Sequence, residues 1–288
     1  MTSSPHETGF TAACVQLCAS RDYQRNVAEA KELIREAANR GAHYVQTPEQ
    51  TSIMELERDT LLAAISHEGQ DPALNAFRTL SAQLGIWLHV GSLAIRVAEE
   101  RAVNRAFLID PAGEIAARYD KIHMFDVDLP NGESYRESRT YQPGNSAVVA
   151  DLPWARLGLS ICYDLRFPHL YRNLAQAGAT VLTAPSAFTR RTGEAHWQVL
   201  QRARAIENGA FMISAAQGGT HENGRETFGH SIIVDPWGEI LAEAGTEPGV
   251  ILAEIDMARV TETRQRIASL THDRPFAAPG METERRAS

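Results

Sequence analysis

The stretch "RLGLSICYDLRFPHL", residues 156–170, joins a predicted strand to a predicted helix. The apolar run 156–162 is typical of a short buried strand, and Pro168 is typical of the first turn of a helix. Cys162 lies at the junction. In α/β proteins, clefts open at the carboxyl ends of strands, and the positive end of a helix dipole lowers the pKa of a nearby thiol. Cys162 is therefore either a buried apolar side chain or a nucleophile.

Strand-like and helix-like segments alternate on both sides of this stretch, and two hairpins interrupt the alternation at 105–121 and 229–245. This order predicts an α/β or α+β fold with mixed sheets. We expect one domain over residues 9–275, with flexible ends at 1–8 and 276–288. The strand-like segments are 11–17, 43–48, 86–95, 146–152, 156–162, 180–188, 210–217 and 249–256, and the helix-like segments are 26–42, 71–84, 168–178 and 195–209.

The composition excludes several classes of function. The 288 residues carry a formal net charge of -8, which argues against a nucleic-acid partner or an anionic membrane surface. The N-terminal residues lack the charged and apolar regions of a secretory signal, and no apolar run is long enough to span a membrane. Three cysteines are too few for a disulfide framework and have no zinc-site spacing. We expect a cytoplasmic protein that requires no metal and no cofactor.

A nucleophilic cysteine needs a base, and the candidate histidines His123, His196 and His230 lie in no recognisable cysteine-peptidase context. Glu49 follows a predicted strand, where desolvation raises a carboxyl pKa toward that of a useful general base. The alternative for Glu49 is a surface glutamate in a loop. Lys121 follows the second strand of the first hairpin, and its alternative is a solvated lysine.

Three segments that contain these residues resemble the Glu, Lys and Cys motifs of the nitrilase superfamily of carbon–nitrogen hydrolases. They are "TPEQ" (47–50), "RYDKIHMFDVD" (118–128) and "GLSICYDLRFP" (158–168). Segments 135–144, 185–211 and 229–245 fit the same family, so the resemblance covers about residues 10–275. The sequence Cys-Tyr-Asp after the strand is similar to the amidase branches, whereas true nitrilases carry Cys-Trp-Glu.

The resemblance implies a four-layer α-β-β-α sandwich, in which helices flank two mixed central sheets. It also implies that subunits pair through their helical layers as a homodimer or a higher homo-oligomer.

The resemblance assigns catalytic roles as well. Cys162 is the implied nucleophile, and Glu49 is the implied base that moves the proton from the thiol to the leaving amine and later activates water. Lys121 and the backbone N–H of Tyr163 are the implied donors to the tetrahedral oxyanion, and Glu137 supports the lysine and the substrate. These roles agree with the physical demands of amide hydrolysis, because a thiolate splits one difficult step in two and a fixed ammonium acts on charge that develops in the transition state.

Within the family, this chain resembles amidases that act on the terminal amide of a 2-oxo acid. The resemblance therefore implies a small carboxylated amide as substrate: deaminated glutathione, cleaved to 2-oxoglutarate and cysteinylglycine. The alternatives are the omega-amidase substrate 2-oxoglutaramate and an N-carbamoyl amino acid. Residues 50–52 depart from the pattern of these amidases. This difference concerns the identity of the substrate and not the catalytic mechanism.

The implied substrate-binding residues are Tyr163, Arg166, Ser186 and Ala187. Arg166 suits a substrate carboxylate because its planar fork binds two oxygens, and its alternative role is a structural salt bridge with Asp164 or a helix carboxylate. Arg190 and Arg191 are expected near the mouth of the site, although loop arginines are usually solvated.

Overall fold

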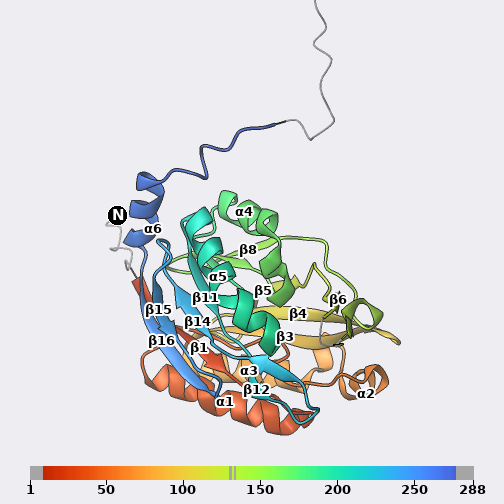
Figure 1. Ribbon diagram of the computed structural model, residues 1–288. Helices are drawn as coiled ribbons and strands as arrows, with labels where there is room; N and C mark the ends of the chain where they lie inside the picture. Colours follow the sequence, from red (N-terminus) through yellow and green to blue (C-terminus); the bar gives the residue numbers. More distant parts are fainter. Residues whose placement is uncertain (1–8, 130–131, 133, 277–288) are drawn as a thin grey trace, which may run out of the picture.

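The computed structural model describes residues 9–129, 132 and 134–276. Two six-stranded sheets form its centre (Figure 1). The order in the first sheet is β16-β1-β2-β3-β4-β5, with bounds Gly249–Asp256, Gly9–Gln16, Tyr44–Gln46, Trp87–Ala98, Arg101–Ile109 and Ile115–Asp120. The order in the second sheet is β15-β14-β11-β10-β9-β8, with bounds Ile240–Glu243, Ile232–Val234, Phe211–Ser214, Val181–Thr183, Arg156–Leu159 and Val148–Asp151.

The two sheets share one design, in which three parallel strands lie in the middle and antiparallel strands lie at the edges. In the first sheet β1, β2 and β3 are parallel, and in the second sheet β9, β10 and β11 are parallel. The carboxyl ends of these central strands lead into the loops that carry Glu49 and Cys162. The mixed character predicted from the alternation of segments is therefore confirmed.

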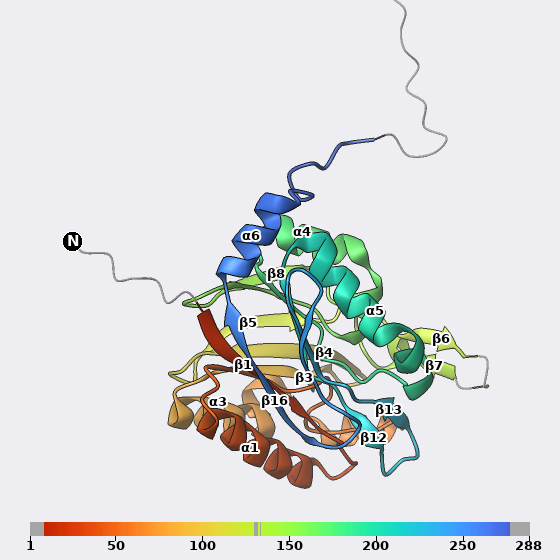
Figure 2. The same ribbon diagram turned by 60° about the vertical axis from the view of Figure 1, so that its left-hand side comes forward.

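Helices cover the outer face of each sheet, so the molecule has four layers. Figure 2 shows α1 (Tyr23–Asn39) and α3 (Pro72–Leu84) below the sheets, and α4 (Pro168–Gln176) and α5 (Arg190–Asn208) above them. The short helices α2 (Arg58–Ala64) and α6 (Ala258–Arg266) lie at the ends of the sandwich. This arrangement confirms the predicted α-β-β-α sandwich.

Strand β1 shows how alternation builds the layers. Ala13 and Val15 pack with the apolar faces of α1 and α3, whereas Ala12 and Cys14 belong to the core that includes the second sheet. Cys14 is fully buried in this core. Cys18 is only half-buried, and its thiol donates to the Thr220 carbonyl at 3.6 Å.

Local signals fix the helix ends as the sequence predicts. The Asp71 carboxylate accepts the Leu74 N–H at 2.8 Å, Pro72 occupies the first turn, and Gly85 ends α3 with φ of +65°. Gly41, which was expected to stop the first helix, has φ of +90° just after α1.

Around the site the observed elements differ from the predicted ones. The strand expected over 156–162 ends at Leu159, and Cys162 begins a 3₁₀ helix, η3 (Cys162–Arg166). The strand expected over 180–188 covers only β10. Helix α5 begins at Arg190, five residues before the expected start. Apolar composition does not show where the backbone leaves the ladder, because loop segments beside a buried site are also apolar.

Helix α6 and two small hairpins lie in segments whose sequence did not predict them. The hairpins are β6 (Asp126–Asp128) with β7 (Ser134–Arg136), and β12 (Gly218–Thr220) with β13 (Glu226–Phe228). No helix in the described residues is both long enough and apolar enough to cross a membrane. Flexible ends were expected at 1–8 and 276–288; of these only Phe276 belongs to the described residues, where it is exposed, and the boundaries 9–275 stay a prediction.

Candidate active site

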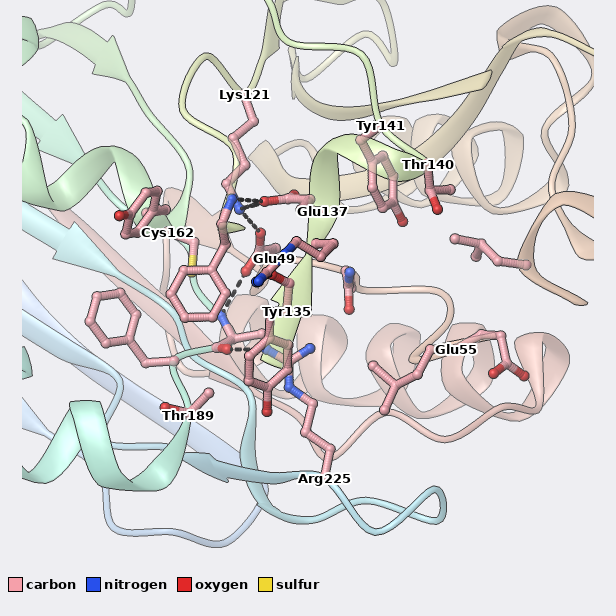
Figure 3. Close-up of a pocket in the computed structure, with 18 of the residues that line it drawn as sticks. Glu49, Glu55, Lys121, Tyr135, Glu137, Thr140, Tyr141, Cys162, Thr189 and Arg225 are labelled. Carbon is pink, nitrogen blue, oxygen red and sulfur yellow. Dashed lines mark hydrogen bonds and ion pairs between the residues drawn. The ribbon is translucent and has the colours of Figure 1, made fainter. Parts of the chain in front are cut away.

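Four side chains that are far apart in the sequence meet in one cavity of about 230 Å³. Glu49 follows β2, Lys121 follows β5, Glu137 begins the 3₁₀ helix η2 (Glu137–Arg139), and Cys162 begins η3. Figure 3 shows the lysine ammonium between the two glutamates, with the cysteine sulfur beside them. Because Glu49 and Lys121 come from the first sheet and Cys162 comes from the second, the site is built where the two sheets meet.

The lysine is held by two carboxylates. Lys121 Nζ lies 2.9 Å from Glu49 Oε1 and 3.0 and 2.8 Å from the two oxygens of Glu137. Asn104 Nδ2 donates to both glutamates, at 2.9 Å to Glu49 Oε1 and 3.1 Å to Glu137 Oε1. The Phe125 N–H donates to Glu137 Oε2 at 2.7 Å. These contacts leave the lysine and its two partners with fixed positions before any substrate arrives.

The charges on this cluster are set by their neighbours. Burial alone lowers the pKa of Lys121, but attraction to Glu137 and Glu49 outweighs it and raises the pKa well above its usual value. Burial alone raises the pKa of Glu49, but the Lys121 ammonium outweighs it and lowers the pKa. The resting site therefore contains an ammonium and an ionised base, and the expected rise in the pKa of Glu49 is wrong because Lys121 is so close.

Cys162 rests as a thiol. Burial raises its pKa, the Glu49 carboxylate raises it further, and the Lys121 ammonium opposes the rise without cancelling it. Two carboxylates and one ammonium already give the cluster a charge of −1, so a thiolate would increase the repulsion. The expectation that a helix terminus lowers the pKa of this thiol is wrong. Attack by the sulfur therefore requires that the Glu49 carboxylate, which hydrogen-bonds the thiol, takes its proton.

The backbone at the cysteine is strained. Cys162 has φ of +49°, and its N–H donates to the Pro185 carbonyl at 3.0 Å. Gln50, next to Glu49, also has a positive φ, of +55°. Non-glycine residues adopt this region at a cost, and such residues cluster at functional sites. Strain at Cys162 and beside Glu49 aims both side chains into the same cavity.

Two of the predicted substrate-binding residues, Tyr163 and Ala187, line the cavity. Tyr163 lines the cavity, and its N–H belongs to the first turn of η3, where N–H groups have no partner within the helix. The Ala187 N–H donates to Glu49 Oε2 at 2.9 Å, so Ala187 holds the base. Ser186 does not line the cavity, and its role as a substrate contact stays a prediction. Its hydroxyl donates to the Ala184 carbonyl at 2.7 Å, and the residue lies behind the cavity wall.

Arg166 lines the cavity, and its alternative role as a salt bridge with Asp164 is not observed. In the described part of the chain Arg166 has no ion pair, and its nearest polar contact is His196 Nδ1 at 3.2 Å. Its guanidinium lies 5.4 Å from the centre of the Phe188 ring. The Asp164 carboxylate instead accepts the Tyr119 hydroxyl at 2.7 Å. Arg166 therefore keeps donors for a ligand.

The other candidates lie away from the cavity. His123 contacts Asp164 at 2.7 Å, and His230 lies 3.3 Å from Glu243, so neither histidine is placed to act on Cys162. Arg190 is exposed at the start of α5 and pairs with Glu194 and Glu226. Arg191 is exposed as well.

Sequence reasoning missed several residues of the site. Asn104 orients both glutamates from the middle of β4, and Arg225 reaches the cavity from the loop between β12 and β13. A lone asparagine within an apolar strand was the only available signal for the first. Nothing in the glycine-rich segment around Arg225 distinguished a cavity residue from a solvated one.

A sandwich of this topology, with an ionised Glu–Lys pair beside a strained cysteine, defines a hydrolase of carbon–nitrogen bonds. The carbon–nitrogen hydrolase family model matches residues 11–265. The chain belongs to this family, the one that its motifs resemble. It is an amidase that acts on carbon–nitrogen bonds other than peptide bonds.

Two curated relatives are informative. The chain is 42% identical over 272 residues to a deaminated glutathione amidase from Synechocystis sp., which covers 91% of this chain and 97% of the relative. It is 36% identical over 260 residues to an omega-amidase from Homo sapiens, which covers 90% of this chain and 93% of that protein.

Two solved structures have the same architecture. The C. elegans NitFhit protein matches with a TM-score of 0.87 and 34% identity; the match covers 93% of this chain and 65% of that longer protein. A variant of an amidase from Nesterenkonia sp. AN1 matches with a TM-score of 0.77 and 28% identity, covering 94% and 98% of the two chains. That structure holds the acetamide moiety of fluoroacetamide covalently on its active-site cysteine.

Proposed function

We propose that this amidase hydrolyses deaminated glutathione to 2-oxoglutarate and cysteinylglycine through a thioester on Cys162. The observation that carries the mechanism is the contact of one ionised carboxylate, Glu49, with both Lys121 and the Cys162 thiol. The substrate is supported by the relative at 42% identity, which is named for this activity.

The first half of the reaction forms the thioester. The Cys162 sulfur attacks the amide carbonyl carbon while Glu49 accepts the thiol proton. The carbonyl oxygen gains negative charge, which the Lys121 ammonium and the Tyr163 N–H stabilise; one such donor is typically worth about 100- to 1,000-fold in rate. Glu49 then gives its proton to the nitrogen, the carbon–nitrogen bond breaks, and the amine leaves.

The second half consumes water. Glu49, ionised again, takes a proton from a water molecule whose oxygen attacks the thioester carbon. The oxyanion reforms at the same donors, the carbon–sulfur bond breaks, and the sulfur recovers the proton from Glu49. One amide and one water give one carboxylic acid and one amine, and the enzyme returns to its starting state.

Arg166 is proposed to bind the carboxylate of the 2-oxo acid. It lies four residues after the nucleophile, lines the cavity and keeps unused donors. A guanidinium binds a carboxylate in a bidentate manner, which fixes the acyl group relative to Cys162.

A second candidate, an omega-amidase reaction on 2-oxoglutaramate, is favoured by the relative at 36% identity. It uses the same acyl group and releases ammonia. A third candidate is N-carbamoyl amino acid hydrolysis.

A substrate panel tests the proposal. Purified enzyme is incubated with deaminated glutathione, 2-oxoglutaramate and an N-carbamoyl amino acid, and products are quantified by mass spectrometry. The proposal expects the highest kcat/KM for deaminated glutathione. A higher kcat/KM for 2-oxoglutaramate would assign the omega-amidase function instead.

We also propose a cytoplasmic homodimer, or a higher oligomer, that pairs through its helical layers. Exposed apolar side chains support this: Val199 and Ile206 lie on the outer face of α5, and Trp237 and Ile240 lie nearby at the β14–β15 turn. The unpaired state of all three cysteines is compatible with a reducing compartment. Light scattering of wild type and V199E tests the interface, with a smaller mass expected for the variant.

A further inference from the structure

The arginines that line the cavity differ in whether they form an ion pair with an acidic residue. Of the four that line it, Arg58 and Arg136 form ion pairs with acidic residues. Arg166 and Arg225 have no ion pair within the described ranges 9–129, 132 and 134–276. The cavity therefore presents two guanidinium groups that form no ion pair with a carboxylate of the described residues, and such groups favour an anionic ligand.

Arg225 is held in place by contacts that leave most of its donors unused. Its Nη2 donates to the Ala187 carbonyl at 2.7 Å, and its Nη1 lies 3.6 Å from Met54 Sδ. The guanidinium lies 5.5 Å from the centre of the Tyr135 ring. Its Nε is buried and has no hydrogen-bond partner among the described residues. Figure 3 shows the side chain reaching from its loop toward Glu49.

The two arginines contact different parts of the cavity wall, Arg225 beside Ala187 and Arg166 in the turn η3. Ala187 separates Arg225 from the base, because its N–H donates to Glu49 and its carbonyl accepts from Arg225. Glu49 has to protonate the leaving nitrogen, so the leaving group lies on the Glu49 side. Arg166 belongs to the turn that carries the nucleophile and therefore lies on the acyl side.

We propose that Arg225 binds a carboxylate on the leaving amine, and that it thereby selects amides of amino acids or peptides over amides that release ammonia. This inference rests on the proposed function, since cysteinylglycine ends in a carboxylate. Two extended residues span about 7 Å, which places that carboxylate well beyond Glu49 along the cavity.

The competing role for Arg225 is support of Ala187, and through it of Glu49. A supporting residue affects every substrate alike, whereas a carboxylate-binding residue affects only substrates that carry the carboxylate. A matched pair of substrates separates these roles: deaminated glutathione, and the same molecule with its terminal carboxylate replaced by a carboxamide.

The experiment measures kcat/KM for both substrates with wild type, R225Q, R225K and the control R190Q. Arg190 is exposed, pairs with Glu194 and Glu226, and lies outside the cavity lining. Wild type should prefer the carboxylate substrate by about 10- to 100-fold, as expected for a hydrogen bond between charged groups. R225Q should remove this preference through a higher KM, R225K should keep part of it, and R190Q should keep all of it.

Each outcome decides between the alternatives. An R225Q variant that retains the wild-type preference overturns the inference, whether or not its overall rate falls. A wild-type enzyme that cleaves both substrates equally overturns the inference and leaves the proposed function intact. A wild-type enzyme that cleaves neither substrate overturns the proposed function, and the inference with it.

Discussion

Two buried carboxylates flank the cysteine turn, and they differ in what surrounds them. Asp164 accepts the Tyr119 hydroxyl at 2.7 Å, the His123 N–H at 3.1 Å and the Ile161 N–H at 2.9 Å. None of these residues lines the cavity. Glu49 is also buried, but it lines the cavity, shares Lys121 with a second carboxylate and contacts the thiol.

The comparison separates a carboxylate that stabilises the fold, Asp164, from a carboxylate that takes part in the reaction, Glu49. Asp164 ties the cysteine turn to strand β5 and to the segment that follows Lys121, so it fixes the distance between the nucleophile and the cation. Glu49 accepts hydrogen bonds from Lys121 and from the Ala187 N–H, and it also contacts the Cys162 thiol, whose proton it takes in the proposed reaction. We therefore expect loss of Asp164 to affect stability first and loss of Glu49 to affect rate first.

The largest effect is expected for Cys162→Ala. Removal of the nucleophile should lower kcat by at least about 10⁴-fold, because no other side chain can form the covalent intermediate. The measurement is product release from deaminated glutathione, with circular dichroism to show that the fold is retained. Cys14→Ala, which removes a buried thiol outside the cavity, is the control and should keep its activity. Full activity of C162A would contradict the role of Cys162 as the nucleophile.

Glu49→Gln should lower kcat by about 100- to 10,000-fold, as expected for loss of a general base. Its thermal unfolding should stay close to that of wild type, within about 1 kcal/mol, because functional charges are often unfavourable for stability. The Lys121–Glu137 pair remains intact in this variant. A large loss of stability with normal kcat would reverse the roles assigned to the two carboxylates.

Asp164→Asn should lower the stability of the fold more than it lowers kcat, which is the opposite of the effect expected for E49Q. An amide group cannot accept all the donors that point at Asp164, so a buried donor is left without a partner. We expect a loss of about 2–4 kcal/mol in the free energy of unfolding, measured by urea denaturation. Tyr119→Phe removes one of these donors and should cost less; a D164N variant as stable as wild type would contradict the structural role.

The pH profile gives the smallest expected effect. Because Lys121 lowers the pKa of Glu49, the base is already ionised above its ordinary pKa, and activity is lost only as pH falls through the lowered value. Because the pKa of Cys162 is raised, no thiolate accumulates near neutral pH. The value of kcat/KM should therefore be nearly flat from about pH 5.5 to 8.5, given the ordinary pKa values. A tenfold rise across this range would show that thiolate population limits the rate.

Much of the sandwich could be predicted from local signals. Asp71 and Pro72 define the start of a helix by their own chemistry, and the strand 249–256 has the bounds that the apolar run indicated. The four-layer arrangement and the pairing of Glu49, Lys121 and Cys162 came from family resemblance, because contacts between segments this far apart leave no local pattern.

The rest could not be predicted from sequence for physical reasons. The left-handed backbone at Cys162 depends on the Pro185 carbonyl and on Asp164, which tertiary packing brings together. The pKa of the Cys162 thiol is raised first by burial and then by the Glu49 carboxylate, neither of which the local sequence shows, and the sequence suggested the effect of a helix dipole instead. The sequence does not show that Ser186 lies outside the cavity lining while Ala187 belongs to it, because adjacent residues in a loop face different ways.

The central claim is that Cys162 carries the acyl group during turnover. The most direct measurement is mass spectrometry of peptides from the wild-type enzyme, quenched in acid during turnover of deaminated glutathione. The account predicts a 2-oxoglutaryl thioester on the peptide that contains Cys162, and none when C162A is treated in the same way. Product formation by wild type with an acyl group on another residue, or an adduct that persists in C162A, would contradict it.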